Sequence, residues 1–146
     1  MLEVVRRFGS VQFDPLAVAG RNHDLVLHAR VAGYDPDLLY ERRDVFEAFN
    51  KGLSLVPMSD VPWFRVPWRE GAPRVLAESA EVAERVLERI RSDGPLSALD
   101  FERGPTGDQW GWGDSQRTSA ARAVLEAYSV TGVIGLARRD GNRRHY

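Results

Sequence analysis

The second half of the chain carries the clearest periodic pattern. Apolar residues recur every three or four positions from 76 to 90 and from 121 to 128, which predicts amphipathic helices over about 74–92 and up to about 130. We expect the inner faces of these helices to form one core. Its predicted members are Leu76, Ala83, Val86, Leu87, Ile90, Val124, Leu125 and Tyr128.

Weaker signals lie between and after these two helices. Leu96, Leu99 and Phe101 predict a short helix, and Asp114 or Ser115 could cap the next one. Gly132 should end that helix, a strand should follow over 133–138, and Asp140-Gly141 is typical of a two-residue hairpin turn. Helix, short helix, helix and hairpin is the order of a winged helix, a variant of the helix-turn-helix.

The first half is less regular. We expect a helix closed by Gly9, an extended segment over 10–14, partial helix over 16–31 and a helix from 38 to about 49. Pro57 and Pro62 suggest a loop with a short helix over 52–62. The expected fold class is therefore mainly α with short β-hairpins, of winged-helix type and possibly built from parts of two tandem winged-helix units. The expected division is a partial unit over 1–72 and a second unit over 73–146 that is truncated in its wing.

Composition limits the function classes. With 43% apolar and 28% charged residues, the chain is globular, and the absence of cysteine excludes disulfides and thiolate metal sites. The chain contains no membrane-spanning run and no signal peptide, so we expect a cytoplasmic protein without membrane contact. The net charge of −1 means that any nucleic-acid contact must come from local basic patches.

The most informative chemistry lies in the extended segment. Gln12 and Asp14 alternate with Phe13, so both should face one surface while Phe13 faces the core. A carboxylate beside an amide can hold a water and stabilise a developing positive charge. The alternative is that Asp14, placed before Pro15, simply initiates a turn and that Gln12 is a polar strand-edge residue.

Five segments in order make the chain resemble the AlkZ/YcaQ-type DNA glycosylases of bacteria, over nearly its whole length. The segments are Gln12-Phe13-Asp14-Pro15, Arg21-Asn22-His23-Asp24-Leu25-Val26-Leu27, Tyr34-Asp35-Pro36, Glu41-Arg42-Arg43-Asp44-Val45-Phe46-Glu47 and Ser54-Leu55-Val56-Pro57-Met58-Ser59-Asp60. The family consists of winged-helix proteins linked to the repair of alkylated bases and interstrand crosslinks. Its proteins are much longer, so we expect this chain to be a fragment, which could be inactive by itself.

The resemblance implies a glycosylase that hydrolyses the N-glycosidic bond of N7-alkylated or crosslinked purines in duplex DNA. Asp14 would stabilise the oxocarbenium-like sugar and guide water, and Gln12 would position that water. This chain has the Gln-x-Asp form of the motif, which resembles the crosslink-processing branch. Lys51 is the single lysine, which disfavours a Schiff-base lyase and favours a monofunctional enzyme. We expect no cofactor, double-stranded DNA as partner, a monomer and association with the nucleoid.

Other residues are candidates for holding DNA. Arg21 could bind phosphate and Asn22 and His23 could make polar contacts, or these residues could be a solvated helix start. Four arginines surround the predicted hairpin and could bind phosphates: Arg138, Arg139, Arg143 and Arg144. Zinc is not expected, because His23 and His28 are five positions apart and do not share a helix face.

The aromatic residues leave two interpretations open. Trp110 and Trp112 could stack on a base or pack their loop onto the helices, and Trp63 and Trp68 are expected to pack in the core between the two units. The main alternative function is a winged-helix DNA-binding module or regulator without catalysis. A protein-interaction module is a third possibility.

Overall fold

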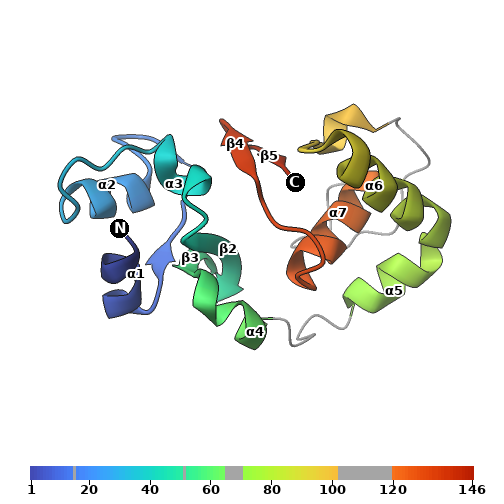
Figure 1. Ribbon diagram of the computed structural model, residues 1–146, viewed down its shortest axis with the longest axis horizontal. Helices are drawn as coiled ribbons and strands as arrows, with labels where there is room; N and C mark the ends of the chain where they lie inside the picture. The colour runs from blue at the N-terminus through green and yellow to red at the C-terminus, as the bar shows by residue number, and fades with distance from the viewer. Residues whose placement is uncertain (15, 51, 65–70, 102–119) are drawn as a thin grey trace. The chain divides into compact units, whose positions relative to one another are not determined.

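The computed structural model describes residues 1–14, 16–50, 52–64, 71–101 and 120–146 (Figure 1). The chain folds as two compact units, Met1–Phe64 and Arg65–Tyr146. Within the described residues, the architecture is mixed, with seven α-helices, a small three-stranded antiparallel sheet and a two-stranded hairpin. Each unit has its own hydrophobic core and is described separately.

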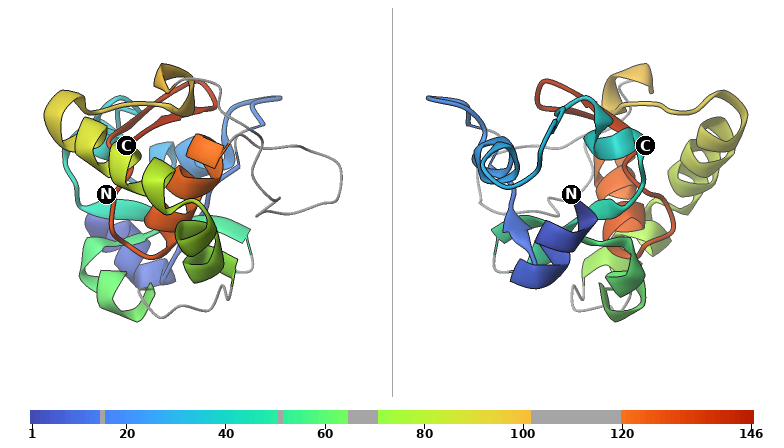
Figure 2. Two further views of the ribbon diagram at one scale, coloured as in Figure 1. Left: turned by 90° about the vertical axis from the view of Figure 1, so that its right-hand side faces the viewer. Right: turned by 60° about the vertical axis from the view of Figure 1, so that its left-hand side comes forward.

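The first unit is built around the three-stranded sheet, whose order is β1-β3-β2. Its elements in chain order are α1 (Leu2–Phe8), β1 (Val11–Gln12), α2 (Asn22–His28), α3 (Leu38–Glu41), β2 (Val45–Asn50), β3 (Gly52–Pro57), the 3-10 helix η1 (Met58–Asp60) and α4 (Val61–Phe64). Helix α1 packs on β3 and helix α2 packs on β1 (Figures 1 and 2). The core of this unit lies between the helices and the sheet, and its most buried residues are Val5, Leu27, Leu39 and Leu55.

Two expectations for this unit are confirmed. Gly9 follows α1 with φ 76°, a left-handed conformation that glycine adopts without strain. The extended segment is the short strand β1, which pairs with β3 through Val11 opposite Leu55 and Gln12 opposite Ser54. The partial helix expected over 16–31 is confirmed only in part, because α2 covers Asn22–His28 alone.

The predicted helix from 38 to 49 is wrong. Only Leu38–Glu41 is helical, and Val45–Asn50 is the strand β2. The apolar residues at 45, 46 and 49 fit helical spacing, but they are β-branched or aromatic and pair instead with 52–57. The predicted loop over 52–62 is therefore also wrong at its start, because Gly52–Pro57 is the central strand β3.

The second unit follows the predicted order of elements. Its described elements are α5 (Gly71–Glu78), α6 (Ala80–Asp93), the 3-10 helix η2 (Ala98–Asp100), α7 (Ala120–Val130), β4 (Arg138–Asp140) and β5 (Arg143–His145). The single helix expected over 74–92 is divided at Ser79 into α5 and α6. The suggested caps Asp114 and Ser115 lie outside the described residues.

The predicted core of this unit is largely confirmed. Ala83, Val86, Val124 and Leu125 form its buried centre, and Leu76, Ile90 and Tyr128 pack against it. Leu87 is not part of this cluster; its side chain is half-buried and lines an open groove with Ala80, Glu84 and Arg91.

The hairpin at the end of the unit begins later than expected. The strand predicted over 133–138 starts only at Arg138, and Asp140 pairs with Arg143, so Gly141 and Asn142 form the turn. Gly141 has φ 58° there, the left-handed conformation that such a turn requires. Reciprocal backbone hydrogen bonds of 2.9 and 2.8 Å join Leu96 to Tyr146 and attach the return strand to the start of η2.

Candidate functional site

The alternation of burial expected over residues 11–14 is confirmed. Val11 and Phe13 are buried in the core of the first unit, Gln12 is exposed and Asp14 is half-buried. The strand is held at its end because the Phe13 amide donates to the Leu53 carbonyl at 2.7 Å. Gln12 at the end of β1 and Asp14 two residues further on are thus the less buried positions of a segment that Val11 and Phe13 anchor in the core.

The carboxylate of Asp14 also takes part in the local turn. Its Oδ1 accepts a hydrogen bond of 2.9 Å from the Leu16 amide, which is the contact of an Asp that initiates a turn. This contact uses one oxygen of a half-buried group and sets the direction of the carboxylate. A turn role and a chemical role at Asp14 are therefore compatible.

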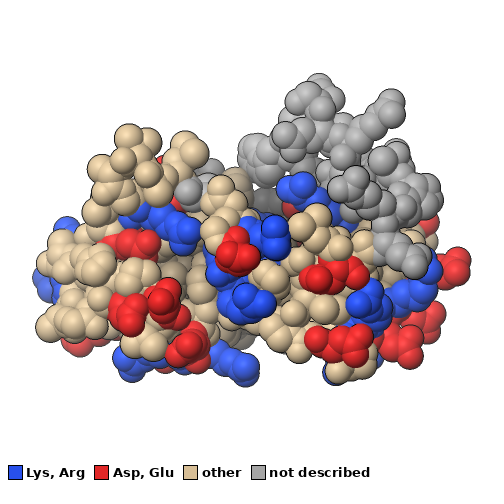
Figure 3. Space-filling model, turned by 90° about the horizontal axis from the view of Figure 1, so that it is seen from above, with Lys and Arg blue, Asp and Glu red and all other residues tan. Residues whose placement is uncertain are grey.

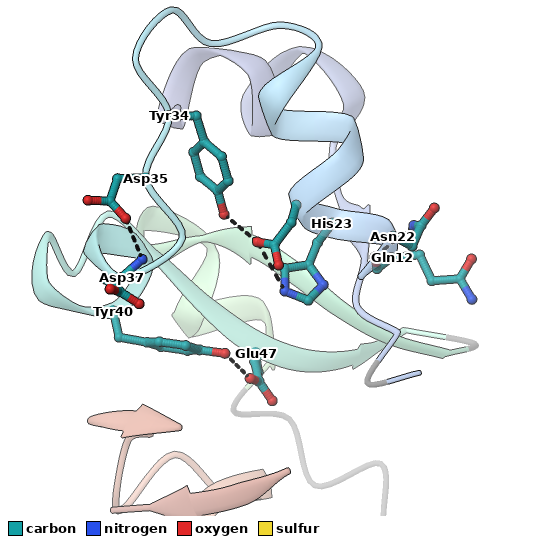
Figure 4. Close-up of polar contacts among 9 residues, drawn as sticks. Gln12, Asn22, His23, Tyr34, Asp35, Asp37, Tyr40 and Glu47 are labelled. Carbon is teal, nitrogen blue, oxygen red and sulfur yellow. Dashed lines mark hydrogen bonds and ion pairs between the residues drawn. The ribbon is translucent and has the colours of Figure 1, made fainter. Parts of the chain in front are cut away.

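Asn22 connects the first turn of α2 to this strand. Its Nδ2 donates to the Gln12 carbonyl at 3.0 Å, and the two side chains lie close together in Figure 4. Asn22 thus brings the start of α2 beside the Gln12 segment, ten positions away in sequence. The structure brings these two candidate residues together.

His23 does not have the solvated environment that either sequence interpretation assumed. Its side chain is 1% exposed and its ring stacks on Phe13 with centroids 4.1 Å apart. Such burial does not suit direct contact with DNA, because the residue lies in the apolar core between α2 and β1. The sequence contains no signal that separates His23 from the less buried polar residues on either side of it.

A hydrogen-bonded pair behind His23 was missed by sequence analysis. The Tyr34 hydroxyl donates to Asp24 Oδ1 at 2.8 Å, and the same oxygen lies 3.6 Å from His23 Nε2 (Figure 4). Burial, followed by the hydrogen bond to Asp24, raises the pKa of Tyr34 well above its usual range, and the nearby Arg21 charge opposes this shift. Tyr34 is therefore a neutral donor that holds the carboxylate beside His23. The sequence showed only a turn at this position.

The predicted basic patch lies on the hairpin. Arg139 is opposite Arg144, while Arg143 is 3.8 Å from the Asp140 carboxylate across the turn. Seen from above, basic side chains gather over this hairpin with acidic groups beside them (Figure 3). The hairpin therefore concentrates positive charge that the net charge of −1 does not reveal.

The remaining candidates are placed as follows. Trp63 is 78% exposed, and Trp68, Trp110 and Trp112 lie outside the described residues. The expected packing of Trp63 is between the two units and stays a prediction. Among the residues described, no three or more histidine or acidic side chains are grouped to hold a metal ion. No helix in the described part of the chain is long and apolar enough to cross a membrane.

Comparison with known proteins identifies the family. The family model described as DNA glycosylase AlkZ-like matches residues 5–146. Neither the curated proteins nor the solved structures contain a match. Since this match covers nearly the whole of the 146-residue chain, the chain belongs to the AlkZ-like DNA glycosylase family.

Proposed function

We propose that this chain carries the catalytic motif of a DNA repair glycosylase that releases N7-alkylated or crosslinked purines from duplex DNA by water attack. Membership of a DNA glycosylase family supports the reaction class, hydrolysis of an N-glycosyl bond. The observation that supports the proposal is the alternation of burial over residues 11–14, in which Gln12 is exposed and Asp14 half-buried while Val11 and Phe13 lie in the core. The substrate class rests on the resemblance of the Gln-x-Asp motif.

The two side chains have different roles in this mechanism. As the glycosidic bond breaks, the deoxyribose develops oxocarbenium character, and the Asp14 carboxylate stabilises that positive charge. The Gln12 amide can both donate and accept, so it orients the attacking water toward the sugar carbon. The Leu16 backbone amide holds the Asp14 carboxylate through Oδ1, and the Asn22 side-chain amide holds the backbone of Gln12 through its carbonyl.

Binding to duplex DNA would use side chains from both units. Arg21 and the hairpin arginines would hold phosphates, and Asn22 would add a polar contact. In the second unit, α6, η2, α7 and the β4–β5 hairpin follow winged-helix order, and the Leu96–Tyr146 pairing attaches the hairpin to the helices. These features support a winged-helix unit with the hairpin as its wing.

The experiment is base release from a duplex with one N7-methylguanine, using the full-length protein. Release of free N7-methylguanine, leaving an uncut strand with an abasic site, is the expected result for a monofunctional glycosylase. Simultaneous strand cleavage would contradict the monofunctional assignment.

The hairpin arginines also suit the second candidate, a winged-helix DNA-binding module without catalysis. Duplex binding with no base release from any N7-alkylated substrate would favour that alternative.

A further inference from the structure

An apolar loop follows the proposed catalytic pair directly. Residues 16–19 have the sequence Leu-Ala-Val-Ala, and all four are exposed. Leu16 is 69% exposed and Val18 is 99% exposed, the highest value among the large apolar side chains that are exposed in the described chain. A side chain as exposed as Val18 contributes nothing to the core, so packing does not explain why it is apolar.

Both ends of the loop are fixed to the site. At its start, the Leu16 amide donates to the carboxylate of Asp14 at 2.9 Å. At its end, Gly20 has φ 131°, and a Cβ built there would lie 3.0 Å from the Leu25 side chain, so glycine allows the chain to turn back closely past α2. The loop is thus a short projection whose base is the Asp14 turn and the start of α2.

Chemistry on a purine base requires that its nucleotide leave the base stack. Proteins that distort duplex DNA insert apolar side chains such as leucine between base steps, where these side chains replace part of the stacking that the separated bases give up. An apolar tip beside the group that acts on the sugar suits this purpose. Arg21, two positions after the loop, adds a positive charge that could hold a phosphate of the same DNA.

We propose that residues 16–19 form a wedge that enters the base stack beside the nucleotide held at Asp14, with Leu16 and Val18 as its inserted side chains. This inference rests on the proposed glycosylase function. It adds how the nucleotide would leave the base stack and become accessible to Asp14. The small size of the tip favours DNA over a protein partner. A stable protein interface buries about 1,200–2,000 Å² in total, whereas a wedge needs only one or two side chains.

The test uses the full-length protein and a duplex that carries 2-aminopurine next to a 2′-fluorinated N7-methylguanine. The fluorine destabilises the cationic sugar of the transition state, so the N7-methylguanine stays attached to the DNA. The fluorescence of 2-aminopurine rises when its neighbour leaves the base stack, so it reports insertion of the wedge. The variant is the double substitution Leu16→Ser with Val18→Ser, and the matched control is Leu99→Ser, which changes a side chain of similar exposure in the second unit. Val18→Ile keeps an apolar tip.

The double variant should lose most of the fluorescence rise, and its single-turnover release of unfluorinated N7-methylguanine should fall by about tenfold or more, because unstacking is no longer compensated. Leu99→Ser and Val18→Ile should behave like the parent. A parental fluorescence rise in the double variant would overturn the wedge. A missing rise that comes with a lower melting temperature or a changed oligomeric state would also overturn it, since Leu16 and Val18 would then be packing residues.

The same data separate this inference from the proposed function. If the parent raises fluorescence but releases no base, the glycosylase assignment fails while the wedge stands. If the parent releases base and the double variant matches it in both assays, the wedge fails while the glycosylase assignment stands. If the parent does not raise fluorescence, the wedge fails whatever the release assay gives.

Discussion

The imidazole ring of His23 lies almost flat on the phenyl ring of Phe13, with centroids 4.1 Å apart and 16° between the planes. This stack joins the first turn of α2 to the extended segment in which Gln12 and Asp14 stand on either side of Phe13. Asp24 Oδ1, which accepts from the Tyr34 hydroxyl, lies 3.6 Å from His23 Nε2. The position of the proposed catalytic strand therefore depends on polar groups in the core as well as on apolar packing.

Tyr34 should stay protonated at a pH where ordinary tyrosines ionise. Burial and the hydrogen bond to Asp24 raise its pKa, so its stabilising effect is fully present below the ordinary tyrosine pKa of about 10 and is lost only as pH rises through the higher folded value. The sequence contains four tyrosines. The difference in tyrosinate absorbance between the parent and Tyr34→Phe reports the ionisation of Tyr34 alone. In the folded protein, this difference should appear only above the pH at which ordinary tyrosines ionise. In urea, it should appear at the ordinary tyrosine pKa.

The same variant tests the hydrogen bond itself. Tyr34→Phe leaves the ring but removes the donor to a half-buried carboxylate, which should cost about 1–3 kcal/mol of stability in denaturant unfolding. An ordinary midpoint in the difference titration, together with unchanged stability, would mean that the Tyr34–Asp24 contact is not maintained in solution.

The core of the second unit gives a comparison between two leucines. Leu125 is 1% exposed in the cluster with Val86 and Val124, and Leu125→Ala should cost about 2–5 kcal/mol. Leu87 is half-buried at an open groove, so Leu87→Ala should lower the free energy of unfolding by only about 1 kcal/mol. This is less than the cost expected for the core residue that its position in the helical period predicted. Denaturant unfolding measures both, and Leu99→Ala, at an exposed site, is the control. Equal costs at Leu87 and Leu125 would contradict the placement of Leu87 outside the core.

The extent to which sequence predicts structure differs between the two units. In the second unit, long helices show their period directly, so their inner faces could be predicted except where Leu87 meets solvent. In the first unit, Val45 and Phe46 fit a helix by spacing, yet antiparallel pairing with the next strand, β3, makes this segment a strand. The sequence does contain a strand signal here, because these residues are β-branched or aromatic, but the helical spacing conflicts with it.

The candidate site shows the same division. The alternation of Gln12, Phe13 and Asp14 follows from the period of a strand, so their facing was predictable. The burial of His23 and its link through Asp24 to Tyr34 depend on how α2 docks on β1 and how the turn at Tyr34 folds back. A polar run in sequence gives no sign of which members will be enclosed.

If the hairpin binds phosphates, its arginines should control the salt dependence of duplex binding. Removing the charge at Arg138, Arg139, Arg143 or Arg144 should reduce the slope of log affinity against log salt by about 0.9 for each phosphate that is no longer held, for all DNA sequences alike. Asp140→Asn should have the opposite effect on affinity at low salt, because Asp140 lies 3.8 Å from Arg143. Arg74→Gln, on the exposed side of α5, is the control. An unchanged slope in the arginine variants would argue against the hairpin as a DNA-binding element.

The proposed chemistry at Asp14 can be separated from its turn role. Asn at position 14 keeps an oxygen that can accept from the Leu16 amide, so Asp14→Asn preserves the local contact and removes only the charge. Because the carboxylate acts on a cation that exists only near the transition state, the rate of base release should fall far more than DNA affinity. Loss of such a stabiliser lowers the rate by about 10²–10³, or roughly 3–4 kcal/mol. Gln12→Ala should lose less, since water can partly rearrange.

The chain contains a matched control for this substitution. Asp35 Oδ1 accepts from the amide of Asp37 at 3.0 Å, which is the same contact to the residue two positions on, in an exposed turn of the same unit (Figure 4). Asp35→Asn should therefore leave both base release and binding unchanged. The measurement is single-turnover release of N7-methylguanine from duplex DNA by the full-length protein, with binding titrated in parallel. If Asp14→Asn released base at the parental rate, as Asp35→Asn should, then Asp14 would serve only as the turn residue before Pro15 and the catalytic carboxylate would have to lie elsewhere.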